Sequence, residues 1–168
     1  KRVLNHFDGK PVADLEAFSI DIGNIYSWRR FFQNNNTYQE LINSGNFGLL
    51  SNDSIKNTLL NLETLYKKLK DEESHFRYDS EILLYEPSFE IVDHNLIVEN
   101  YKYHLSGGQI GSKIPLKRTQ FQAMLSDLKQ KNGFTMAIFE FEIMNQHFES
   151  MKQMSNTLIL LIDKEIED

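Results

Sequence analysis

Residues 134–167, FTMAIFEFEIMNQHFESMKQMSNTLILLIDKEIE, decide the fold class that we expect for this chain. The stretch contains neither proline nor glycine, the two residues that most often interrupt a helix. Apolar side chains recur along one side, which is the pattern of an amphipathic helix packed against a core. At about 1.5 Å per residue this helix would be roughly 50 Å long. The apolar positions are Ile138, Phe141, Phe148, Met151, Leu158 and Ile162.

Two upstream segments repeat this pattern and predict two further long helices. Residues 54–78 follow a Ser-Asn-Asp cluster of helix-capping residues. Residues 12–32 carry a second apolar stripe in which Arg29 takes one position, and the asparagines after Gln33 are expected to end this helix. The apolar positions are Ile55, Leu59, Leu62, Tyr66 and Leu69 in one segment and Leu15, Phe18, Ile22, Ile25 and Phe32 in the other.

Shorter helices are predicted from local capping chemistry. Thr37 and Glu40 have the spacing of a capping box, in which each side chain bonds the backbone N–H of the other residue. Gly45 stands where a left-handed residue would close this helix. A further helix from residue 119 is expected to stop at the Lys-Asn-Gly of residues 131–133.

Residues 79–118 have the least regular pattern. We expect helical pieces before Pro87 and over residues 89–103, with a pair of short strands as the alternative. Residues 106–115, SGGQIGSKIP, are predicted to form a loop. The fold class is therefore all-α: a single helical domain over residues 1–168, a bundle with three long helices, and an irregular or β element left open within 79–118.

Composition excludes several classes of protein and site. The net charge is −6 and the pI is near 5.4, whereas nucleic-acid binding is favoured by basic surfaces. No nucleic-acid partner is predicted. Because the chain has no cysteine, disulfides and thiolate-ligated metals are excluded. No run of 18 apolar residues occurs in the sequence, so no membrane span is predicted within it.

Motifs for catalysis, cofactors and metals are weak. The glycines of residues 106–113 lack the spacing and the lysine of a phosphate-binding loop. Glu72 and His75 have the three-residue spacing used in di-iron bundles, but no second pair of this kind occurs. Glu140 and Glu142 would point about 200° apart on a helix and form no carboxylate dyad. We therefore predict no cofactor, no metal and no catalytic residue.

Residues 37–55 resemble the hallmark block of an uncharacterised bacterial family. Its members are short proteins with one N-terminal transmembrane helix followed by a mostly helical extracytoplasmic domain. The closing residues 158–168, LILLIDKEIED, also resemble the end of that family, whereas residues 79–118 do not match. The matching positions are Thr37, Tyr38, Glu40, Leu41, Ile42, Ser44, Gly45, Asn46, Asn52, Asp53, Ser54 and Ile55.

The resemblance implies a setting and no activity. It places the chain at the periplasmic, extracytoplasmic face of a bacterial inner membrane, with Lys1 following an anchor that this sequence lacks. We expect a non-enzymatic ligand-sensing or protein-interaction module whose partner is a protein or a small molecule, with oligomerisation left open. The alternative is a hydrolase-like site around Arg29, Glu40, Ser44 and Asn46. The residues predicted to bind a ligand are Arg29, Tyr38, Glu40, Ser44 and Asn46.

Overall fold

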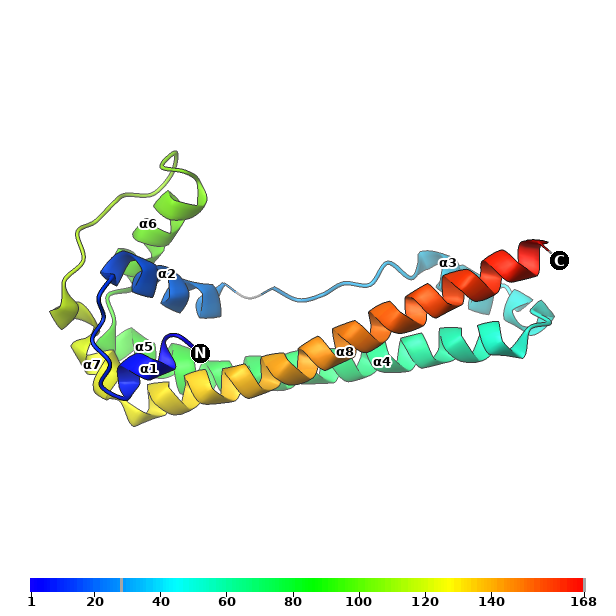
Figure 1. Cartoon of the computed structure of the whole chain (residues 1–168), viewed down its shortest axis with the longest axis horizontal. Coiled ribbons are helices and arrows are strands. Elements are labelled where there is room, and N and C mark those ends of the chain that lie inside the picture. The colour runs from blue at the N-terminus through cyan, green and yellow to red at the C-terminus, as the bar shows by residue number, and fades with distance from the viewer. Residues whose placement is uncertain (28, 168) are drawn as a thin grey trace. The chain divides into compact units, whose positions relative to one another are not determined.

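The computed structural model describes residues 1–27 and 29–167 and confirms the all-α class (Figure 1). No strand occurs in these residues, so 79–118 folds as helices joined by a loop. In chain order the α-helices are α1 (Leu4–Phe7), α2 (Leu15–Tyr26), α3 (Asn36–Asn43), α4 (Asp53–Ser80), α5 (Glu86–Ile91), α6 (His94–Leu105), α7 (Gln122–Ser126) and α8 (Leu128–Glu167). Two 3-10 helices, η1 (Asn46–Leu49) and η3 (Arg118–Phe121), and the π-helical turn η2 (Glu81–Tyr85) complete the order.

The chain divides into two compact units. The first unit consists of Lys1–Arg29 and His75–Glu140, and the second consists of Arg30–Ser74 and Phe141–Asp168. Each unit is therefore made of two separate stretches of chain, and both α4 and α8 contribute residues to both units. The single domain over residues 1–168 stays a prediction.

The helix predicted over 54–78 is confirmed as α4, Asp53–Ser80. Asn52 caps it, since its Oδ1 accepts the backbone N–H groups of Ser54 at 3.0 Å and Ile55 at 3.2 Å. The long C-terminal helix is also confirmed. It is α8, and it begins at Leu128 rather than at residue 134.

The predicted helix stop at residues 131–133 is wrong, because Gly133 lies inside α8. A Cβ atom at Gly133 would lie 2.6 Å from Leu84 Cδ2 and 2.9 Å from the Leu83 carbonyl oxygen. The glycine therefore permits close packing of α8 against η2. The start of α8 is set instead by Asp127, whose carboxylate accepts the Gln130 N–H at 2.9 Å.

The first long helix was predicted over 12–32 but ends as α2 at Tyr26. In the second unit, Lys70 and Glu73 of α4 hold the backbone of Phe31 in a non-helical conformation. The Phe31 N–H donates to Glu73 Oε1 at 2.7 Å, and Lys70 Nζ donates to the Phe31 carbonyl at 2.9 Å. These bonds satisfy backbone groups that a continued helix would have used. Phe32, predicted on the buried stripe, is 78% exposed.

The interior of the first unit is organised around η2. Pro87 has no N–H, so a regular helix would leave the Leu83 carbonyl without its usual partner. Gln130, which is fully buried, donates from Nε2 to the carbonyl of Leu84 at 2.7 Å and to that of Leu83 at 3.4 Å. The Tyr26 hydroxyl donates to Gln130 Oε1 at 3.3 Å. The polar groups exposed by the π-helical turn are thus satisfied inside the protein.

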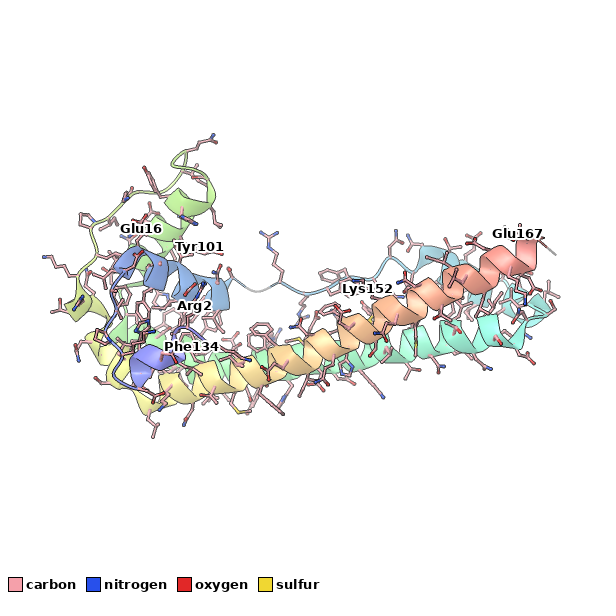
Figure 2. The ribbon with its side chains drawn as sticks, in the orientation of Figure 1. Arg2, Glu16, Tyr101, Phe134, Lys152 and Glu167 are labelled. Atoms are coloured by element: carbon pink, nitrogen blue, oxygen red, sulfur yellow. The ribbon has the colours of Figure 1, made fainter. Side chains whose placement is uncertain are left out.

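Helices α2 and α6 pack together in the same unit. Tyr101, labelled in Figure 2, lies on α6 and donates from its hydroxyl to Asn24 Oδ1 at 3.1 Å. Its ring lies against Gly23, where a Cβ atom would come within 2.7 Å of the ring. A small residue at position 23 is therefore required for this approach.

Candidate functional site

The second unit contains a cavity of about 540 Å³. Its walls come from the segment before α3, from α3 itself, from the first turns of α4 and from the last turns of α8. The apolar stripes predicted for the two long helices supply five of the lining residues. Among the apolar residues that line the cavity are Leu41, Ile55, Leu59, Leu62, Leu158 and Ile162.

Hydrogen bonds at the start of α4 tie this helix to α8. Asn52 Nδ2 donates to Glu165 Oε2 at 2.7 Å, and Ser51 Oγ donates to Glu165 Oε1 at 3.4 Å. Glu165 also lines the cavity. These hydrogen bonds connect the cap of α4 to the last turns of α8 beside the cavity.

Two buried acceptor atoms belong to residues that line the cavity. Gln33 Oε1 and Glu63 Oε2 have no hydrogen-bond partner within the described residues. The other Glu63 oxygen lies 3.8 Å from the Nζ of Lys67, whose side chain is exposed. A buried acceptor without a partner costs roughly 1–3 kcal/mol. These atoms therefore favour a bound molecule that can donate hydrogen bonds.

Tyr38 contributes an aromatic wall. It is half-buried, lines the cavity, and contacts Phe47 edge-on with the ring centroids 6.2 Å apart. Burial, with a smaller contribution from the Glu63 carboxylate, raises the pKa of the Tyr38 hydroxyl above its usual value of 10.0. The hydroxyl is therefore neutral at physiological pH and can donate or accept a hydrogen bond.

The other predicted site residues do not line this cavity. Glu40, Ser44 and Asn46 are exposed, and Ser44 Oγ donates to the Leu41 carbonyl at 3.2 Å. Arg29 is exposed and belongs to the first unit. It lies beyond the end of α2, although the sequence had predicted that the helix would include it. Its neighbour Trp28 lies outside the described residues. Of the five predicted positions, the structure places Tyr38 at the cavity.

The predicted corner around α3 is correct in part. Gly45 has a φ of 77° and follows the end of α3, as the sequence indicated. The predicted capping box of Thr37 and Glu40 is wrong, because α3 begins at Asn36, with Asn35 as its N-cap and no side-chain cap bond. The helix starts two residues earlier than expected, so Thr37 lies within its first turn.

Gln33 and Glu63 were missed by the sequence reasoning. Gln33 was assigned to the end of a helix, and Glu63 follows Leu62 on the predicted stripe of α4. The stripe itself was a usable signal, because a polar residue beside it can face the same interior. Periodicity does not, however, distinguish a filled interior from a hollow one.

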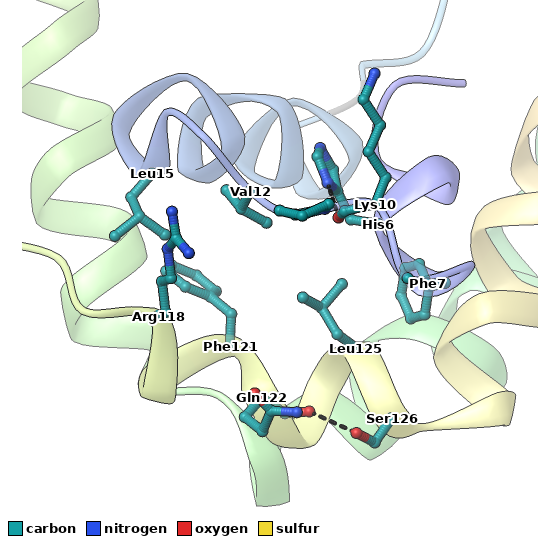
Figure 3. Close-up of a pocket in the computed structure, with 12 residues that line it drawn as sticks. His6, Phe7, Lys10, Val12, Leu15, Arg118, Phe121, Gln122, Leu125 and Ser126 are labelled. Carbon is teal, nitrogen blue, oxygen red and sulfur yellow. Dashed lines mark hydrogen bonds between the residues drawn. The ribbon is translucent and has the colours of Figure 1, made fainter.

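The first unit has a smaller cavity of about 290 Å³ between its N-terminal segment and α7 (Figure 3). Several polar groups here already have partners in the protein. His6 Nδ1 donates to the Lys10 carbonyl at 2.8 Å, and Ser126 Oγ donates to the Gln122 carbonyl at 2.9 Å. We therefore consider the cavity of the second unit the better candidate.

Comparison with protein-family models, curated proteins and solved structures gave no match for this chain. Among the described residues, no helix has both the length and the hydropathy needed to cross a membrane. The identification of the candidate site is therefore based on the geometry of the structure alone.

Proposed function

We propose that this chain is a non-enzymatic ligand-binding module. Its ligand is a small amphipathic molecule with an apolar body and a head that donates hydrogen bonds, bound in the cavity of the second unit. The observation that carries the proposal is the pair of buried acceptors, Gln33 Oε1 and Glu63 Oε2, in an otherwise mostly apolar lining. Small-molecule sites combine an apolar wall with a few polar groups in this way.

Size and charge narrow the class of ligand. The cavity volume of about 540 Å³ lies within the range of roughly 300–1,000 Å³ typical of small-molecule sites. Glu63 and Glu165 both line it. Their charge disfavours an anionic head such as a carboxylate or sulfonate, and favours a hydroxyl or an amine.

We further propose an extracytoplasmic, membrane-tethered setting for this module. This part of the proposal depends on the resemblance of residues 37–55 to the bacterial family described above. A topology reporter fused to the natural protein in cells would test it. A reporter signal from the cytosol would contradict the setting and leave the ligand proposal untouched.

Two related dyes test the ligand proposal. N-phenyl-1-naphthylamine has an apolar body and an N–H donor, and 1-anilinonaphthalene-8-sulfonate adds a negative charge to nearly the same body. We expect the uncharged dye to bind with a fluorescence increase, and the sulfonate to bind about tenfold more weakly. Glu63→Gln should reduce the difference in affinity between the two dyes, because it removes a negative charge from the cavity lining.

A matched pair of variants locates the binding. Leu59→Trp fills the cavity and should abolish binding of the uncharged dye. Leu60→Trp is the control, since Leu60 is 45% exposed and does not line the cavity. Equal dye binding by the two variants, with unchanged circular dichroism, would contradict the proposal.

An exposed apolar group in the same unit supports protein interaction as a second candidate. Leu49, Leu160 and Ile166 are 79%, 70% and 77% exposed. Exposed apolar side chains indicate a protein–protein interface where they form one contiguous patch. Concentration-dependent association that Leu160→Glu abolishes, without dye binding in the cavity, would favour this function over ligand binding.

A further inference from the structure

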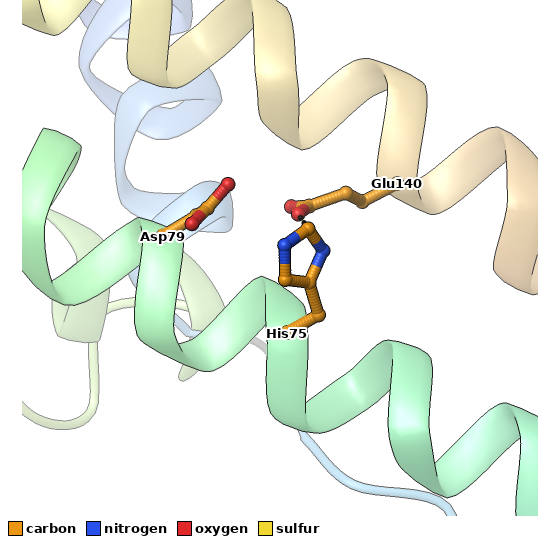
Figure 4. A group of neighbouring side chains, drawn as sticks. All are labelled: His75, Asp79 and Glu140. Carbon is orange, nitrogen blue, oxygen red and sulfur yellow. Dashed lines mark ion pairs between the residues drawn. The ribbon is translucent and has the colours of Figure 1, made fainter.

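Three side chains that can bind a metal ion converge in the first unit. His75 and Asp79 lie on α4 and Glu140 lies on α8 (Figure 4). Each offers one ligand atom, and the three atoms lie within 4.8 Å of one another. The His75 Nδ1 and Glu140 Oε1 atoms are 3.1 Å apart.

The two residues on α4 are placed by helix geometry. Residues four apart lie on the same face of a helix, so His75 and Asp79 point toward the same neighbour. Histidine and a second ligand at this spacing form a common chelating pair on helices. In the sequence, Glu72 was noted for its three-residue spacing from His75, but no metal site was predicted there. The structure selects Asp79 instead, because Glu140 approaches α4 at that side (Figure 4).

Burial and charge at this cluster favour a cation. The Glu140 side chain is 2% exposed, Asp79 is half-buried, and the His75 side chain is 60% exposed. Two carboxylates and one imidazole carry a net negative charge whichever protonation state His75 has. Placing a carboxylate out of water is costly unless positive charge lies nearby. A divalent ion at this cluster would contact both carboxylates and the imidazole at once.

We propose that His75, Asp79 and Glu140 form a binding site for a divalent transition-metal ion, for which Zn²⁺ is the test ion. One imidazole nitrogen and two carboxylate oxygens are ligands that such ions accept. Zinc–ligand bonds of about 2.0–2.2 Å place neighbouring ligand atoms about 3–3.5 Å apart. The His75–Glu140 separation already fits, and a small change in the Asp79 rotamer would bring in the third ligand.

The site has an exposed side, since His75 is accessible to solvent. Water can complete the coordination there. Because the ligands come from α4 and α8, the bound ion links these two helices within the first unit. Metal binding to the folded state alone would then stabilise this unit by mass action.

Isothermal titration of the 168-residue chain with Zn²⁺ tests the proposal. We expect one ion per chain. His75→Ala and Asp79→Asn should each weaken binding at least tenfold, since even partners outside the coordination shell contribute about 10–100-fold to metal affinity. Glu72→Gln and His104→Ala are matched controls. They remove a carboxylate beside His75 and an exposed histidine elsewhere, and should leave the affinity within twofold.

A second readout separates this site from nonspecific binding. Zn²⁺ should raise the melting temperature of the unsubstituted chain and of both controls, but not that of His75→Ala or Asp79→Asn. Glu140→Gln is a further test if circular dichroism shows that this buried substitution folds. Unchanged affinity in His75→Ala and Asp79→Asn, or an equal loss in the two controls, would overturn the proposal. So would the absence of Zn²⁺ binding by the unsubstituted chain.

Discussion

The polar groups around the π-helical turn of the first unit and those that line the cavity of the second unit differ in their partners. In the first unit, Gln130 and the Tyr26 hydroxyl satisfy the backbone carbonyls of the π-helical turn. In the second unit, Gln33 and Glu63 each have a buried oxygen with no hydrogen-bond partner within the described residues. Buried polar atoms are usually paired, so the exceptions indicate places where another molecule is expected. The comparison separates groups that maintain the fold from groups that remain available for binding.

Packing also differs between the contact of α8 with η2 in the first unit and the cavity of the second unit. The first unit brings α8 so close to η2 that residue 133 has no room for a methyl group. The second unit leaves a cavity of about 540 Å³ between apolar walls. Closely packed interiors are sensitive to single methylene groups, whereas a preformed cavity tolerates larger side chains.

The strongest test of the comparison is removal of the central amide of the first unit. Gln130→Leu keeps most of the side-chain volume but leaves the Leu84 carbonyl and the Tyr26 hydroxyl without this partner. We expect the free energy of unfolding to fall by about 2–3 kcal/mol. Gln146→Leu, at an exposed position of the same helix, should change it by less than about 0.5 kcal/mol. Urea unfolding measures both, and equal effects would show that Gln130 is not the central partner described here.

Two substitutions by larger side chains test the difference in packing. Gly133→Ala should lower the free energy of unfolding by about 1–2 kcal/mol, because the added methyl group meets the Leu83 carbonyl and outweighs the helix propensity of alanine. Leu59→Phe adds a similar volume but points into the cavity, so we expect a change within about 0.5 kcal/mol. Thermal and urea unfolding compare the two. If Leu59→Phe lowered the free energy of unfolding more than Gly133→Ala, residue 59 would be the more tightly packed of the two positions.

The smallest effect concerns the Tyr26 hydroxyl. Burial raises its pKa from 10.0 to about 12, so the folded state favours the protonated form. This contribution to stability is fully present below pH 10 and is lost as the pH rises toward 12. Tyr26→Phe should cost about 1 kcal/mol at pH 8, and the difference from the unsubstituted chain should shrink between pH 10 and 12. Tyr78→Phe, at a position that is 65% exposed, should show no such change.

Much of the helical structure was predictable because local signals and burial agree. The stripe and the Asn52 cap of α4 both indicated the helix that forms. The errors occur where a distant residue overrides the local signal. Glu73 and Lys70 hold Phe31 outside the predicted helix, and the close approach of Leu83 and Leu84 explains the glycine that was read as a stop.

The sites were less predictable for the same reason. Tyr38 could be selected from its sequence block, but Gln33 and Glu63 become notable only when their oxygens are found buried and without a partner. Glu140 was dismissed because Glu142 does not share its face. Its relevant neighbours, His75 and Asp79, come from another helix more than 60 positions away. The spacing of residues in the sequence can identify metal ligands that share one helix. It cannot identify a site whose ligands come from two helices.

The alternation of chain segments between the units constrains the order in which they can form during synthesis. Residues 30–74 emerge from the ribosome before residues 141–168, with which they form the second unit. The first unit likewise needs 1–29 to wait for 75–140. The first unit can be completed once residue 140 has emerged, whereas the second unit also needs residues 141–168 and must therefore form last. Residues 30–74, which include most of α4, therefore wait for residues 141–168 of their own unit until synthesis is nearly finished.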